Sequence, residues 1–187
     1  MISSGIRRAG VVFAVILVAS LAADQLSKAW ARTLPVAPAG CALPGEMLAG
    51  RCAGVPKPVV DGYWDWELAY NPGVAFSVFA SAAGHTGMRV ILAVIALIAL
   101  IGISLVALRA PPEQRGRRAA YALIAGGALG NLIDRVRDGA VTDFVRWRIH
   151  DHRWPIFNVA DALLLVGVAL LLLDGLRARR TALRRTE

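Results

Sequence analysis

The sequence predicts a membrane all-α protein, a bundle of four transmembrane helices with a small external β-sheet at the membrane surface. Composition is the first reason, because 57% of the 187 residues are hydrophobic and only 18% are charged. Soluble domains are nearer half apolar and a quarter charged. The other reasons are four long apolar runs and two aromatic segments of alternating polarity between them. We treat residues 1–187 as a single domain.

The predicted spans are the four apolar runs, at about 9–30, 88–108, 119–133 and 159–176. A helix needs about 20 residues to cross the hydrocarbon core of a bilayer. The third run is shorter and contains Asn131. A short run with a polar residue suits a helix that is surrounded by other helices better than one that faces lipid.

The first run has an alternative interpretation as a cleavable signal peptide. Arg7 and Arg8 precede an apolar stretch that reaches Ala23, as in secretory signals. The run continues, however, to Trp30 with a helical pattern, and Asp24 and Lys28 lie one turn apart on the same face. This continuation favours an uncleaved first span.

Flanking charge predicts that both termini are cytoplasmic. With that orientation, 11 of the 21 basic residues lie in inside segments, and many of the others lie in or near a long first loop. Long loops influence topology weakly, so the rule favours this orientation by a narrow margin. The external segments are then 33–87 and 135–157.

Both external segments contain a predicted strand. Aromatic and polar residues alternate at 62–70, and period-two alternation recurs at 141–149. These strands are expected to pair into a sheet on the outer membrane surface. Cys41 and Cys52 lie in the first external segment, where an oxidising compartment favours a disulfide between them.

The net charge of +8 does not indicate a nucleic-acid partner. Nucleic-acid binders gather basic residues on one face, whereas the arginines here flank apolar runs. No metal or cofactor is expected, because the pattern of His150 and His152 around Asp151 is a poor zinc site.

Polar residues from several segments converge on one membrane boundary in this topology. They end the first and third spans, begin the fourth, and lie in the second external segment: Asp24, Lys28, Asn131, Asp134, Arg135, Asp143, Asn158 and Asp161. Ionisable groups near a span are costly and therefore indicate a functional site.

The chemistry that these residue types support is that of paired carboxylates. Two carboxylates held close cannot both ionise, so one keeps a proton while the other acts as a base. Such a pair can activate water for amide hydrolysis without a metal. Residue types alone leave four candidate acids, which are Asp24, Asp134, Asp143 and Asp161.

Five short blocks, in order, resemble the motifs of the lipoprotein signal peptidases (signal peptidase II), the bacterial membrane aspartic peptidases. They are DQLSK at 24–28, NPGVAF at 71–76, GNLIDR at 130–135, VTDF at 141–144 and FNVAD at 157–161. The resemblance implies a catalytic dyad of Asp143 and Asp161. It also implies that Asn71, Asn131, Arg135 and Asn158 position substrate or the carboxylates, and that Asp24 and Lys28 support the structure.

The same resemblance implies the substrate and the location. The substrate would be a prolipoprotein whose cysteine carries a diacylglyceryl group, cut on the N-terminal side of that cysteine. The enzyme would be a multi-pass monomer of the bacterial inner membrane with its active site at the outer face. The 34–62 stretch matches no family block and is given no role.

Two other classes of function fit the sequence less well. A proton-coupled transporter also carries intramembrane acids, but its charges are expected throughout the bilayer depth rather than at one face. A non-catalytic scaffold would leave the clustered acids unexplained. Arg146, Arg148 and Arg153 fall outside the motifs, and we expect them to contact anionic lipid headgroups.

Overall fold

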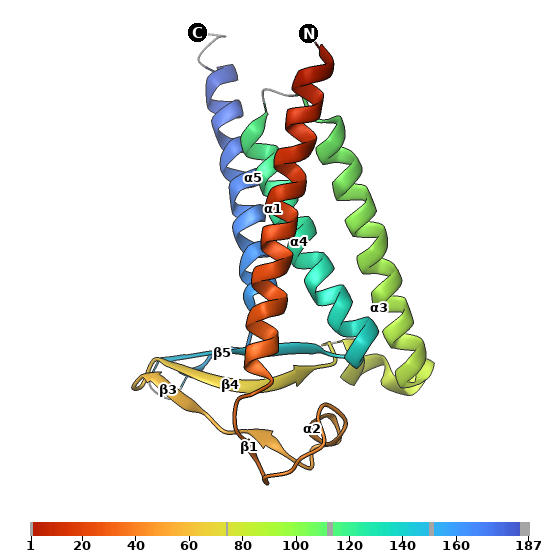
Figure 1. Ribbon diagram of the computed structural model, residues 1–187, viewed down its shortest axis with the longest axis vertical. Helices are drawn as coiled ribbons and strands as arrows, with labels where there is room; N and C mark the ends of the chain where they lie inside the picture. The colour runs from red at the N-terminus through yellow and green to blue at the C-terminus, as the bar shows by residue number, and fades with distance from the viewer. Residues whose placement is uncertain (1, 74, 112–113, 150–151, 184–187) are drawn as a thin grey trace.

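The computed structural model describes residues 2–73, 75–111, 114–149 and 152–183. Four long helices run side by side, and a twisted sheet lies across one end of them (Figure 1). The helices are α1 (Ile2–Ala31), the single-turn α2 (Gly45–Leu48), α3 (Ala75–Arg109), α4 (Arg115–Asp138) and α5 (Val159–Leu183).

Helix α4 is the central helix of the bundle, and it contacts α1, α3 and α5. Small residues allow these close approaches. A Cβ on Gly126 would lie 2.6 Å from the Cβ of Ser20, and a Cβ on Gly127 would lie 2.5 Å from the backbone oxygen of Ala160. These glycines therefore form a helix-packing surface.

Helices α1 and α5 are long and apolar enough to cross a membrane, over Gly10–Ala31 and Val159–Ala178. Their apolar side chains are largely exposed, with Leu26 at 70% and Leu165 at 72%. Water would penalise such surfaces, whereas lipid does not. The helices therefore fit a membrane environment.

The other two predicted spans differ from this pattern. Helix α3 contains a shorter apolar stretch at Ala93–Arg109. Among the described residues, α4 has no stretch that is both long and apolar enough to cross a membrane. The reason is that α4 is enclosed by the other helices, so neighbouring helices rather than lipid surround it.

The helices also extend beyond the predicted boundaries. Helix α3 begins at Ala75, so 75–87, predicted to be external, is the first part of a helix. Helix α4 likewise continues through Asp138, and Gly139 ends it in a left-handed conformation with φ of 71°.

The sheet has the order β3-β4-β5-β6, and all neighbours are antiparallel. Its strands are β3 (Lys57–Val60), β4 (Trp64–Asn71), β5 (Val141–Ile149) and β6 (His152–Arg153). The two strands predicted from alternation are therefore confirmed, and so is their pairing, in which Ala69 lies opposite Asp143.

The long first loop forms a small subdomain on the same side as the sheet (Figure 1). It contains α2 and the short antiparallel pair β1 (Val36–Ala37) and β2 (Ala53–Gly54). A disulfide joins Cys41 to Cys52, as the sequence predicts for an oxidising compartment. Leu34 and Leu68 belong to the apolar cluster under this subdomain.

The start of α1 and the end of α5 lie together at the end of the bundle away from the sheet (Figure 1). The polar residues singled out from the sequence occur at the other end, where α1 and α4 end and α5 begins. The fold thus brings five separate sequence segments to the junction between the helices and the sheet.

Candidate active site

Asp143 and Asp161 approach the junction from different elements. Asp143 lies in β5, in a run of four buried residues that starts at Val141. Asp161 lies in the first turn of α5. Asp143 is 2% exposed, whereas Asp161 is partly exposed. One carboxyl group is therefore enclosed and the other is accessible from the surface.

Asn158 connects the two acids. Its side-chain amide donates to Oδ1 of Asp143 at 2.7 Å, and its side-chain oxygen accepts the backbone N–H of Asp161 at 3.0 Å. The carboxylate of Asp161 in turn accepts the backbone N–H of Asn158 at 3.2 Å. This reciprocal pattern is a capping box at the start of α5. The cap of the helix and the spacing of the two acids thus depend on one residue.

Two further amides complete the hydrogen bonding of the pair. Asn71, at the end of β4, donates to Oδ2 of Asp143 at 3.1 Å. Asn131, in α4, donates to Oδ1 of Asp161 at 2.9 Å. Among the described residues, the hydrogen-bond donors to both carboxyl groups are neutral amides, so no cation is hydrogen-bonded to the pair.

Burial, with the charge of Asp161 as the second cause, raises the pKa of Asp143 from 3.8 to about 7. The hydrogen bonds from Asn71 and Asn158 oppose this rise because they favour the carboxylate. Asp143 therefore retains its proton well above the range of an ordinary aspartic acid. An acid that is half protonated near neutral pH is suited to proton transfer.

A second set of charged residues lies directly behind the pair. Lys28 is fully buried and contacts Oδ2 of Asp24 at 2.9 Å and Oδ2 of Asp134 at 3.1 Å. Arg32 also forms an ion pair with Asp134, with 3.1 Å between its Nη2 and Oδ1 of Asp134. We call these four residues, Asp24, Lys28, Arg32 and Asp134, the ion-pair network.

Two contacts join the ion-pair network to the pair of acids. Lys28 donates to the side-chain oxygen of Asn131 at 2.9 Å, which directs the Asn131 amide toward Asp161. Asp24 accepts the backbone N–H of Ala160 at 3.0 Å, which ties α1 to the first turn of α5. A network of this kind positions its neighbours only while every member is paired.

Arg135 lies at the edge of the site. It donates to the backbone oxygen of Asn131 at 3.3 Å and is close enough to Asp161 and Asp143 for their charges to act on it. Its Nε is buried, and within the described residues it has no hydrogen-bond partner. A buried guanidinium donor without a partner is a candidate contact for a ligand.

The structure brings together every site residue singled out from the sequence. Asp134 pairs with Lys28 and Arg32 rather than with Arg135. Sequence reasoning missed Arg32 and its 2.7 Å bond to the Thr142 hydroxyl. The spacing held the signal, since Arg32 follows Lys28 by four residues on the same helical face.

The described residues contain one close group of possible metal ligands, Cys41, Glu46 and Cys52. The disulfide occupies both sulfur atoms, so neither cysteine can act as a thiolate ligand. His150 and Asp151, which belong to the pattern predicted to be a poor zinc site, lie outside the described residues.

The fold and the site together define a helical membrane protein with paired carboxyl groups where the bundle meets an external sheet. Comparison with known proteins is more specific. The family model for signal peptidase (SPase) II matches residues 16–177. The chain belongs to the signal peptidase II family, and so it is a membrane peptidase.

Curated relatives and solved structures agree. A lipoprotein signal peptidase of Xanthomonas campestris pv. campestris (strain 8004) is 39% identical over 166 residues, which cover 84% of this chain and 86% of that protein. The lipoprotein signal peptidase of Xylella fastidiosa (strain 9a5c) is 36% identical over 157 residues and 83% of each chain. A bacterial membrane enzyme solved by the in meso method at 1.9 Å resolution superposes with a TM-score of 0.67 and 25% identity, over 87% of this chain and 90% of that one.

Proposed function

We propose that this chain is an aspartic endopeptidase that removes the signal peptide from diacylglyceryl-modified prolipoproteins, with Asp143 and Asp161 as its catalytic dyad. The main observation in support is the arrangement of these acids. Both bond to Asn158, both accept hydrogen bonds from neutral amides, and neither forms an ion pair with another described residue. The names of the curated relatives support the substrate class.

The proposed reaction uses one proton of the dyad. Asp143 starts protonated and donates to the carbonyl oxygen of the scissile peptide, while the Asp161 carboxylate removes a proton from water. The resulting hydroxide attacks the carbonyl carbon to give a tetrahedral diol. Collapse of the diol breaks the C–N bond as the leaving amine takes a proton from Asp161. One of the two diol protons returns to Asp143, and the second stays on the new carboxylic acid. Water is thereby divided between the new acid and the new amine.

The neighbouring groups have separate parts in this proposal. Asn71 and Asn158 hold Asp143, and Asn131 holds Asp161, so the two carboxyl groups stay oriented through the cycle. Arg135 offers donors to the substrate backbone beside the dyad. Asp24 and Lys28 act indirectly by fixing Asn131 and the start of α5.

The proposed topology has four spans, α1, α3, α4 and α5, with both termini in the cytoplasm and the dyad at the outer face. Support comes from the disulfide on the sheet side, because disulfides persist in oxidising compartments. The scissile bond of a lipidated signal peptide lies at the lipid–water boundary. A dyad between a helix end and a surface sheet is at a suitable depth and still reachable by water.

The test is cleavage of a diacylglyceryl-modified precursor by purified Asp143→Asn and Asp161→Asn variants in bilayers. Each is expected to lose activity by about 10³-fold or more, because each removes one proton-transfer group of a pair that acts as a unit. Asp61→Asn is the matched control, since Asp61 is exposed near the β3–β4 turn and is expected to leave the rate unchanged. Near wild-type cleavage by either folded dyad variant would refute the assignment.

A further inference from the structure

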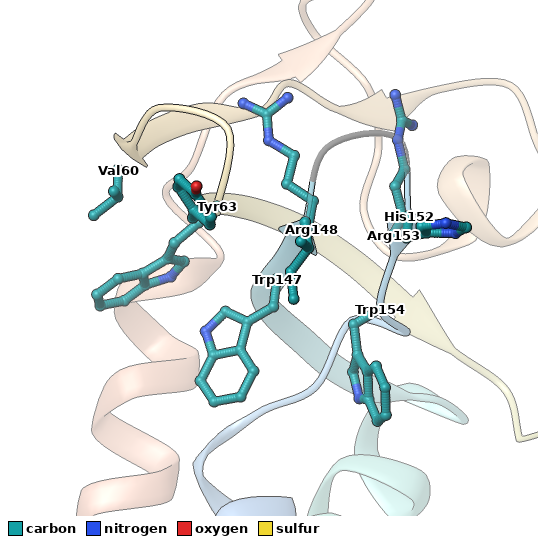
Figure 2. Close-up of a pocket in the computed structure, with 9 residues that line it drawn as sticks. Val60, Tyr63, Trp147, Arg148, His152, Arg153 and Trp154 are labelled. Carbon is teal, nitrogen blue, oxygen red and sulfur yellow. The ribbon is translucent and has the colours of Figure 1, made fainter.

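A second concave site lies at the other end of the sheet. The ends of β3 and β5, the start of β4 and strand β6 line a hollow of about 570 Å³. Its lining includes Tyr63, Trp147, Arg148, Arg153 and Trp154 (Figure 2). Asp143 is four residues from Trp147 along β5, about 13 Å at the usual rise of a strand. The hollow is therefore separate from the dyad.

The hollow has an apolar side and a basic side. In Figure 2 the indoles of Trp147 and Trp154 extend toward the ends of the helices, whereas the guanidinium groups of Arg148 and Arg153 extend in the opposite direction. The indoles are 53% and 67% exposed. Exposed tryptophans beside apolar spans are typical of the membrane interface, where phosphate groups lie farther out than the acyl chains.

The register of β5 and β6 places two cations side by side. Arg148 lies directly opposite Arg153 in the antiparallel pair. Like charges in this position repel each other, so the arrangement is unfavourable unless an anion lies nearby. Asp65 contacts Arg148 at 3.1 Å and offsets one of the two charges. Arg153 is exposed, and no ion-pair partner for it is found among the described residues.

The described acidic residues nearby do not supply that partner. Arg146 donates to both oxygens of Glu67, through Nε and Nη2, so the Glu67 carboxylate is occupied. The Asp65 carboxylate is likewise held by Arg148. The described part of the hollow thus carries one uncompensated positive charge above two exposed indoles. This combination complements a single negative charge joined to an apolar chain.

We propose that this hollow binds an anionic phospholipid of the surrounding bilayer, with its phosphodiester at Arg153 and its glycerol and upper acyl chains against Trp147 and Trp154. The volume is within the range of small-molecule sites. A zwitterionic lipid fits less well, because its ammonium group would lie beside two arginines. The site would hold the sheet at a fixed depth and orientation on the membrane.

The test uses the full chain in nanodiscs of phosphatidylcholine with a trace of photoactivatable phosphatidylglycerol. After illumination, adducts are mapped by mass spectrometry of peptides that contain residues 147–154. We expect labelling of this region, and we expect Arg153→Gln to reduce it about fivefold, the usual effect of one arginine near an anionic surface. Trp154→Ala is expected to reduce it as well.

Arg51→Gln is the matched control. Arg51 is an exposed arginine of the first external loop and does not line the hollow, so its loss changes the net charge equally. Unchanged labelling in this variant supports the proposal. Equal losses in Arg51→Gln and Arg153→Gln would overturn it, because they would indicate only the general surface potential.

Three other outcomes would also overturn the proposal. Equal labelling by a phosphatidylcholine probe would mean that the hollow does not select anionic lipid. Displacement by soluble glycerol phosphate would indicate a site for a free phosphate. Displacement by a prolipoprotein precursor in the absence of anionic lipid would indicate a substrate-docking surface. Because the readout is lipid labelling, it is independent of peptidase activity.

Discussion

Two groups of aspartates lie at the same junction, and their surroundings differ. Asp24 and Asp134 face cations, since both contact the buried Lys28 and Asp134 also contacts Arg32. Asp143 and Asp161 accept hydrogen bonds from asparagine amides and a backbone N–H, and Arg135 acts on them without a direct ion pair. Neighbouring cations balance a carboxylate and hold it in place, whereas neutral amides allow it to gain and lose a proton. Directly bonded partners, rather than residue type or depth, therefore separate a structural acid from a candidate catalytic one.

The largest effect is expected from breaking the ion-pair network. Lys28→Met leaves Asp24 and Asp134 buried with less compensation, and the free energy of unfolding should fall by about 3–5 kcal/mol. Thermal unfolding in detergent measures this loss. Lys57→Met is the control, because Lys57 is exposed in β3. A Lys28→Met protein as stable as wild type would show that the network does not hold the bundle together.

Replacing Asp143, the buried acid of the proposed dyad, with a neutral residue should raise the stability of the protein rather than lower it. Because the pKa of Asp143 is raised in the folded state, its contribution to stability is full at low pH and is lost as the pH rises through about 7. At pH 8, Asp143→Asn should therefore unfold at a higher temperature than wild type, by an amount worth on the order of 2–4 kcal/mol. The gain should shrink at pH 5. A variant less stable than wild type at both pH values would contradict the assigned environment.

A smaller effect is expected at the contact between α1 and α4. A Cβ on Gly130 would lie 2.2 Å from Oδ2 of Asp24, so Gly130→Ala must displace the Asp24 side chain from Lys28. We expect a loss of about 1–3 kcal/mol in stability, as for other overpacked sites. Gly10→Ala is the matched control because its added Cβ meets nothing within 4 Å. Equal stability of the two variants would mean that this contact is not specific.

The smallest effect is expected on the pH dependence of cleavage. The Asn71 amide lowers the pKa of Asp143, so its removal in Asn71→Ala should raise that pKa further. The decline of activity at alkaline pH should then move to higher pH. The rate of precursor cleavage from pH 5 to pH 9 measures this shift. A move to lower pH would contradict the proposed protonated role of Asp143.

The sequence allowed the two central strands of the sheet, β4 and β5, to be predicted because they alternate in polarity at a period that the fold retains. The strand predicted at 141–149 has the bounds of β5. The sequence was less informative about the length of α4, because the amino acids of α4 reflect contact with three helices rather than with lipid. The start of α3 was also missed, since 75–87 precedes the apolar run on which the prediction depended.

The site could be predicted as a set of residues but not as an arrangement. Spacing along the chain places Asn158 beside Asp161 and Asp24 beside Lys28, because the members of each pair are only three or four residues apart. It could not show that Asn131 joins Lys28 to Asp161, since that contact crosses three helices. Physical reasoning therefore left four acids open, and only motif resemblance chose between them. The hydrogen-bond partners now give an independent reason for the same choice.

The most direct test of the central assignment is the pH dependence of kcat/KM for cleavage of a diacylglyceryl-modified precursor by the wild-type protein. If the dyad shares one proton, which resides on Asp143, activity should pass through a maximum and decline with an apparent pKa near 7. Lys57→Met should give the same profile, because that residue is remote from the dyad. A rate that stays constant from pH 6 to pH 9 would contradict the assignment of Asp143 as the proton donor.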